Sequence, residues 1–145
     1  MESLQPPDVA LGALLVAASV VDIRERILPD SLAYSIALCS LLSACMAEGI
    51  RGMECNIFWG GLACAVVMLV ELAWRRGKGS PGIGGGDIKL LLACMVRDPF
   101  WGLASFSVGL IALAGAGCAL SRRSLPLIPF FTAASIVTAL RLGPG

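Results

Sequence analysis

The sequence predicts an all-α, polytopic membrane protein with about six transmembrane helices. Hydrophobic residues make up 57% of the 145 residues, whereas charged residues make up only 14%. A soluble domain usually contains about 25% charged residues. The apolar residues also form long blocks, without the periodicity of a helix or strand that has one wet face. We therefore expect helices that meet lipid or one another on every side.

Apolar segments follow one another along the chain, separated by short charged or glycine-rich stretches. The predicted segments are 9–23, 31–48, 56–74, 87–96, 100–120 and 126–140. A simple bilayer span needs roughly 20 apolar residues, and the first and fourth segments are shorter than that. We expect each of these two to end or begin in a polar region lined by protein. No linker separates the segments, so residues 1–145 are interpreted as a single integral membrane domain.

Lysine and arginine are distributed unevenly among the loops. The loops after the first, third and fifth segments hold Arg24, Arg26, Arg75, Arg76, Lys78, Arg122 and Arg123. The other loops and the termini hold only Arg51, Arg97 and Arg141. Because basic loops favour the cytoplasmic side, we expect a multi-pass protein of the cytoplasmic (inner) membrane with both termini outside. Residues 1–8 contain no basic residue, so we expect a retained first span and no cleavable signal peptide.

The composition disfavours several classes of function. A net charge of +1 gives no electrostatic reason to expect a nucleic acid partner. The chain has no histidine, and its six cysteines contain no C-x-x-C spacing, so we expect no metal site and no cofactor. The missing histidine also excludes Ser-His-Asp and Cys-His catalysis.

Two aspartates stand at the edges of apolar segments and are the candidate catalytic residues. Asp22 follows the apolar run 10–21, and Asp87 comes just before the run 90–93. The charge distribution places both at the cytoplasmic face, where an acid is a functional candidate, although either alone could mark a helix end. Two carboxylates in one pocket share a proton. The ionised one can then activate water while the protonated one donates to a peptide carbonyl.

The residues around Asp87 form a candidate active-site loop. We expect Gly82, Gly84, Gly85 and Gly86 to let the backbone adopt positive φ and approach a neighbour or substrate closely. A helix that starts at Asp87 would place its carboxylate at the positive end of the helix dipole, so we expect Asp87 to be the more readily ionised acid. Lys89 could steady this loop or extend to the membrane interface, and we expect no catalytic role for it.

Three stretches resemble motifs of the type IV prepilin peptidases. Residues 22–30 (DIRERILPD) resemble a first motif in which Ile-Pro-Asn or Ile-Pro-Asp follows an Asp, with Leu28 in place of the Ile. Residues 82–91 (GIGGGDIKLL) resemble the second motif, Gly-x-Gly-Asp-x-Lys-Leu. Residues 125–130 (LPLIPF) are similar to the proline-rich start of the family's last helix.

The resemblance implies a GxGD-type intramembrane aspartyl endopeptidase with six helices and its active site at the cytoplasmic face. Asp22 and Asp87 carry over as the catalytic pair. The implied partners are the lipid bilayer and a prepilin or pseudopilin, whose short basic leader precedes an apolar helix. Longer members carry an additional cytoplasmic, cysteine-bearing region associated with N-methylation, and we expect a short form without it.

Two other functions remain open at this point. A small ion- or proton-coupled transporter could use Glu71, Asp22 and Asp87 as a relay, although all three lie toward one face and none marks the midplane. An inactive scaffold that binds pilin-like helices would not need the two intact aspartates. Glu71 also lies four residues before Arg75, which favours a structural ion pair on one helix. The sequence identifies neither the substrate nor the oligomeric state.

Overall fold

The regular structure is helical throughout the described part of the chain. The computed structural model describes residues 6–79, 83–120 and 125–142. Its helices are α1 (Pro6–Glu25), α2 (Asp30–Lys78), α3 (Gly85–Met95), α4 (Pro99–Leu120) and α5 (Ile128–Leu142). The predicted all-α fold class is therefore confirmed.

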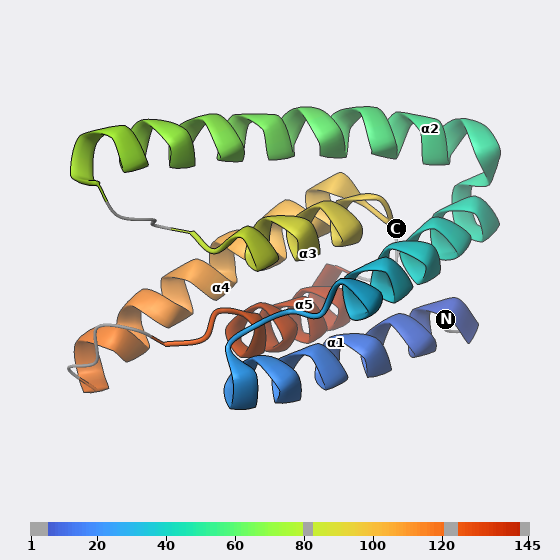
Figure 1. The fold of residues 1–145 in the computed structure, drawn as a ribbon. Coiled ribbons are helices and arrows are strands. Elements are labelled where there is room, and N and C mark those ends of the chain that lie inside the picture. The colour runs from blue at the N-terminus through green and yellow to red at the C-terminus, as the bar shows by residue number, and fades with distance from the viewer. Residues whose placement is uncertain (1–5, 80–82, 121–124, 143–145) are drawn as a thin grey trace.

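The long helix α2 is interrupted at one residue. Gly49 has φ 72° and ψ −177°, whereas its neighbours on both sides are helical. Figure 1 shows that α2 turns sharply there, so that the chain runs back on itself. The two arms of α2 are residues 30–48 and 50–78. The sequence predicted a loop over residues 49–55, and this was wrong: a single glycine makes the turn and the helix resumes directly after it. Such a φ and ψ combination is essentially restricted to glycine.

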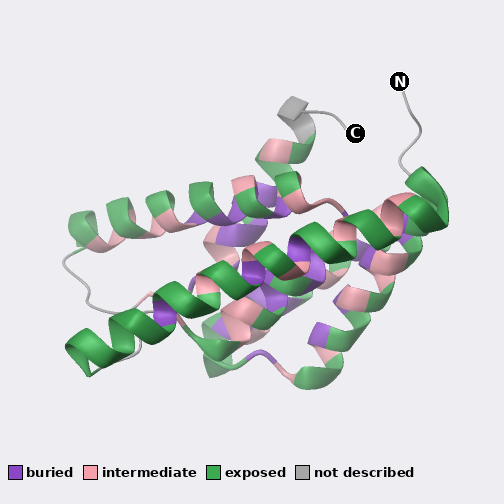
Figure 2. Ribbon diagram, turned by 90° about the horizontal axis from the view of Figure 1, so that it is seen from above, coloured by how far each residue is buried: buried purple, intermediate pink, exposed green. Residues whose placement is uncertain are grey.

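Three helices, α1, α2 and α4, are long and apolar enough to cross a membrane. The apolar part of α5 is shorter, and α3 has 11 residues, a length of about 16 Å against a hydrocarbon core of about 30 Å. The helices support a multi-pass membrane protein, but their lengths do not give six separate spans. Figure 2 shows buried residues in the middle of the bundle and exposed ones on its outward faces. Many exposed residues are large and apolar, including Phe100 and Ile111, as expected of a surface that meets lipid.

The short helix α3 lies in the core. Leu91, Cys94 and Met95 are fully buried within it. Two glycines let the neighbouring helices approach: a Cβ at Gly60 of α2 would lie 2.9 Å from the Met95 Cβ, and a Cβ at Gly102 of α4 would lie 2.9 Å from its Cγ. The C-terminal part of α3 is thus packed closely on two sides, and this packing positions the N-terminus of α3.

The two ends of the bundle differ in their polar contacts. The end of α1, the C-terminal end of α2 and the starts of α3 and α5 lie toward one end of the bundle (Figure 1). At the other end, the buried Arg97 side chain donates from Nε to the Asp8 carboxylate at 3.1 Å. The Asn56 side chain donates to the Arg97 carbonyl at 3.0 Å. These bonds tie α1 and α2 to the connection between α3 and α4.

We expect Gly49→Ala to destabilise the protein by about 1–3 kcal/mol, because a Cβ is strained at this backbone conformation. A Cβ at Gly49 would meet no atom within 4 Å, so the cost comes from the backbone and not from a clash. The measurement is unfolding of the purified protein in mixed detergent micelles. The control is Gly61→Ala, at a helical position with equally open space, which should be neutral or slightly stabilising. Equal stability of the two variants would contradict the glycine requirement.

Candidate active site

Asp22 lies in the last turn of α1 and its side chain is buried. Its Oδ2 accepts a hydrogen bond from the backbone N–H of Ile128 at 3.2 Å. Ile128 is the first residue of α5, so the carboxylate sits at a helix N-terminus, where free N–H groups favour a negative charge. One turn earlier, the Ser19 hydroxyl donates to the Thr132 hydroxyl at 2.7 Å and holds α1 against α5.

Asp87 has a similar setting at the N-terminus of α3. Its Oδ2 accepts a hydrogen bond from the backbone N–H of Gly84 at 3.2 Å. Gly84 is the N-cap of α3, and its carbonyl accepts the N–H groups of Asp87 and Ile88 at 3.1 and 3.3 Å. This is the side-chain half of a capping box, in which an acid at the third helical position binds the N-cap N–H. Both carboxylates therefore lie at helix N-termini, that of Asp22 at the start of α5 and that of Asp87 at the start of α3.

The structure brings the two aspartates together, as the sequence predicted. Asp22 and Asp87 line the same two clefts, of about 240 and 520 Å³. The smaller cleft is otherwise lined mainly by apolar side chains: Ile83, Leu110, Leu113, Leu125, Pro126 and Leu127. The larger cleft is lined by residues 26–30, 84–87 and 89 together with Asp22 and Ile128. A substrate segment in either cleft would meet both carboxylates.

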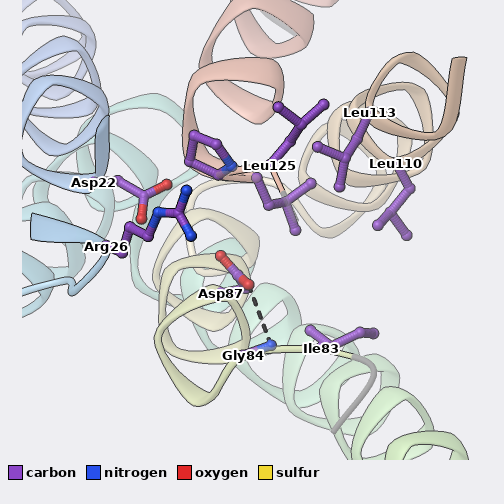
Figure 3. A pocket seen from close by; sticks show the side chains of 10 residues that line it. Asp22, Arg26, Ile83, Gly84, Asp87, Leu110, Leu113 and Leu125 are labelled. Atoms are coloured by element: carbon purple, nitrogen blue, oxygen red, sulfur yellow. Dashed lines mark hydrogen bonds between the residues drawn. The ribbon is translucent and has the colours of Figure 1, made fainter. Parts of the chain in front are cut away.

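Arg26 is a residue of this site whose place the sequence analysis missed. It ends α1 with φ 54°, an uncommon conformation for a residue with a side chain. Its N–H donates to the Asp22 carbonyl at 3.0 Å. Figure 3 shows its guanidinium beside the Asp22 carboxylate, on the side that faces Asp87. The sequence treated Arg26 as a topology signal only, although its spacing of four residues from Asp22 was compatible with a contact.

The expected positive φ values before Asp87 are not found. Gly84 has φ −68° and ψ 145°, and among the described glycines only Gly49 and Gly79 have positive φ. The prediction for residues 84–86 was therefore wrong in this respect. Gly82, which opens the motif, lies outside the described residues. Gly84, Gly85 and Gly86 therefore do not supply a left-handed backbone.

Close approach, the other expectation for these glycines, is found at two of the three positions. A Cβ at Gly84 would lie 2.9 Å from Oδ2 of Asp87. A Cβ at Gly86 would lie 3.3 Å from the Cβ of Leu28, in the connection between α1 and α2. A Cβ at Gly85 would meet nothing within 4 Å. Gly84 thus leaves room for the carboxylate, and Gly86 leaves room for the first motif to pack against the second.

Lys89 makes an ion pair away from the catalytic candidates. Its Nζ lies 2.6 Å from Oδ1 of Asp30, and both side chains are exposed. Asp30 begins α2, so the ion pair joins the two sequence motifs at the edge of the larger cleft. Among the described contacts, Lys89 bonds to Asp30 and makes no hydrogen bond to Asp87. The expected pair between Glu71 and Arg75 is also present, at 2.7 Å.

Comparisons with known proteins agree with this arrangement. The model of the type IV leader peptidase family matches residues 9–143. Neither the curated proteins nor the solved structures contain a match. The matched residues include both aspartates and nearly the whole chain. The chain therefore belongs to the type IV leader peptidase family and is an aspartic-type prepilin peptidase by this membership.

Proposed function

We propose that Asp22 and Asp87 are the catalytic pair and that they hydrolyse the bond between a short basic leader and the apolar helix of a prepilin-like or pseudopilin-like substrate. The observation that carries this proposal is the meeting of two carboxylates from α1 and α3 in the same clefts. Family membership supports the reaction. The relay alternative has less support, because Glu71 is held by Arg75 and by the Ile83 backbone.

The two carboxylates have different surroundings, which suggests different roles. A helix N-terminus carries about half a positive charge, and each aspartate accepts an N–H at such a terminus. Arg26, four residues after Asp22 in the chain, places its positive charge beside the Asp22 carboxylate. A nearby cation favours the ionised form of a carboxyl group. We therefore assign the negative charge to Asp22 and the shared proton to Asp87, opposite to the expectation from the helix dipole of α3 alone.

This assignment gives a balanced hydrolysis. Asp22 takes a proton from a water molecule as the water oxygen attacks the peptide carbonyl carbon, and Asp87 donates its proton to the carbonyl oxygen. The tetrahedral intermediate then breaks at its C–N bond. The proton on Asp22 passes to the departing amine, and Asp87 recovers a proton from a hydroxyl of the intermediate. Both acids end in their starting states.

The membrane arrangement that we propose keeps this site at the cytoplasmic face. The two arms of α2 and the other four helices provide six segments for one domain of residues 1–145, with both termini extracytoplasmic. The basic residues at the ends of α1 and α2, Arg24, Arg26, Arg75, Arg76 and Lys78, lie at the same end of the bundle as the two acids. This distribution supports a cytoplasmic position for that end.

We expect Asp22→Asn and Asp87→Asn each to lower cleavage of a leader-bearing peptide by at least about a hundredfold, since Asn can neither carry the charge nor share the proton. The assay uses protein purified in detergent, with membrane extraction as the check on insertion. Asp98→Asn is the matched control, because Asp98 only caps α4 through the N–H groups of Phe100 and Trp101 and Asn caps equally well. Parental activity in either site variant would refute the assignment.

We expect Gly84→Ala to reduce cleavage about tenfold to a hundredfold with little change in melting temperature. The added Cβ would lie 2.9 Å from the Asp87 carboxylate, and the carboxylate can move away, so that catalytic geometry is lost and packing is kept. Gly77→Ala is the control, since its Cβ would also meet open space and the residue lines neither cleft. Cleavage rates and thermal melts of both variants test this. Equal rates for the two variants would show that space at Gly84 does not matter.

We expect a single cysteine at position 80 to be protected from a membrane-impermeant thiol reagent in intact cells and to react after permeabilisation, because the basic residues near it favour the cytoplasm. The six native cysteines are first replaced. A cysteine at position 54, an exposed residue close to the turn of α2, is the opposite marker and should react from outside. Labelling of position 80 in intact cells would contradict the proposed orientation.

A further inference from the structure

Glu71 is a buried carboxylate inside an apolar stretch of α2. Its exposed fraction is 5%, and its neighbours in the sequence, residues 65–70 and 72–74, are all apolar. A charge in such a place is unfavourable unless it is paired and hydrogen-bonded. The described catalytic pair does not include it, so its burial requires another explanation.

The contacts of Glu71 converge on one residue of the segment that leads into α3. Glu71 Oε2 accepts the backbone N–H of Ile83 at 2.9 Å, and its Oε1 accepts Nε of Arg75 at 2.7 Å. Arg75 in turn donates from Nη2 to the Ile83 carbonyl at 3.4 Å. Both backbone polar groups of Ile83 are therefore bound by the Glu71–Arg75 pair, which fixes this segment to the end of α2.

The peptide unit between Ile83 and Gly84 connects this pair to Asp87. Its carbonyl oxygen is the acceptor for Arg75, and its N–H is the donor to Oδ2 of Asp87 at 3.2 Å. A peptide unit is planar, so holding the carbonyl fixes the direction of the N–H. The direction of that N–H determines where the Asp87 carboxylate is held relative to Asp22.

We propose that Glu71 and Arg75 are positioning residues for the Asp87 carboxylate, acting through the Ile83–Gly84 peptide. The inference rests on the proposed catalytic role of Asp87. Neither residue lines the two clefts, so neither touches the substrate there. The pair orients the peptide, the peptide N–H orients the carboxylate, and the carboxylate then faces Asp22 across the clefts.

The test compares kcat and KM for a leader-bearing peptide in Glu71→Ala, Glu71→Gln and Arg75→Gln. Misplacement of a catalytic group by about 1 Å costs roughly a hundredfold in rate, so we expect kcat of Glu71→Ala to fall on that order while KM changes less than about threefold. Gln keeps an oxygen for the Ile83 N–H and should restore part of kcat. The effects of Glu71→Ala and Arg75→Gln should be non-additive in the double variant, because both act on one peptide unit.

Melting temperatures and the fraction of folded protein are measured beside the kinetics. A loss of kcat in well-folded Glu71→Ala, with partial rescue by Gln, supports positioning. If kcat falls only in proportion to the fraction of folded protein, the positioning role is overturned. A parental kcat in Glu71→Ala overturns it as well. If Glu71→Ala does not fold, Arg75→Gln is the deciding variant, because Arg75 is half-exposed. A lower kcat with unchanged melting temperature in Arg75→Gln supports the inference, and a parental kcat overturns it.

Asp87→Asn in the same assay separates the two proposals. If Asp87→Asn is inactive and Glu71→Ala is fully active, the catalytic assignment stands and only positioning fails. If Asp87→Asn is active, the proposed function fails, and positioning fails with it. Glu54→Ala, an exposed acid on the same helix, is the matched control and should leave kcat and melting unchanged.

Discussion

The constraint on which the site depends is the need to hold two carboxylates in an apolar helix bundle. Each is costly there unless positive charge or N–H groups compensate it. The structure meets this need with helix N-termini: α5 supplies the Ile128 N–H to Asp22, and α3 begins with the Gly84 N–H to Asp87. Helices that begin at this end of the bundle therefore determine where the acids can be placed.

The rest of the fold serves to bring these two helix starts together. α3 is too short to span and is buried, and the close contacts of Gly60 and Gly102 with Met95 fix its far end. Gly86 allows its near end to pack on Leu28, directly after α1. Asp87 is thereby placed beside the last turn of α1, which carries Asp22. The Lys89–Asp30 ion pair joins the same two elements at the surface, where exposed pairs contribute little stability.

The sequence predicted the elements whose signals are local. The apolar blocks gave the ends of α1, α3, α4 and α5 to within three residues, and the acids at their edges gave the pair that lines the clefts. The sequence analysis predicted a loop of several residues where Gly49 alone makes the turn, because a glycine with polar residues on both sides is typical of loops in general. Positive φ was wrongly expected at 84–86 because glycine was interpreted as backbone freedom, whereas the structure needs room for the Asp87 side chain and for Leu28.

Contacts between distant residues could not be predicted in the same way. Nothing in the sequence around Ile128 shows that its N–H meets Asp22, and nothing around Ile83 shows that it meets Glu71. Glu71 was correctly paired with Arg75 because that pairing lies within one helix. Its second oxygen reaches across to another segment, and such a contact depends on how two helices pack and on no local pattern.

The position of the pair at the end of the bundle also suits the bond that a leader peptidase must break. Peptide bonds inside a helix are hydrogen-bonded and wrapped by side chains, whereas the first N–H groups of a helix have no partner within it. A bond just before an apolar helix is therefore the one that can extend into a cleft without unwinding the membrane-embedded part of the substrate. Hydrolysis also needs water, which the hydrocarbon core lacks and the end of the bundle can reach. The clefts lie at the end of the bundle, between the end of α1, the start of α3, the second half of α4 and the residues that lead into α5. Both conditions can be met there, and a pair at the midplane would meet neither.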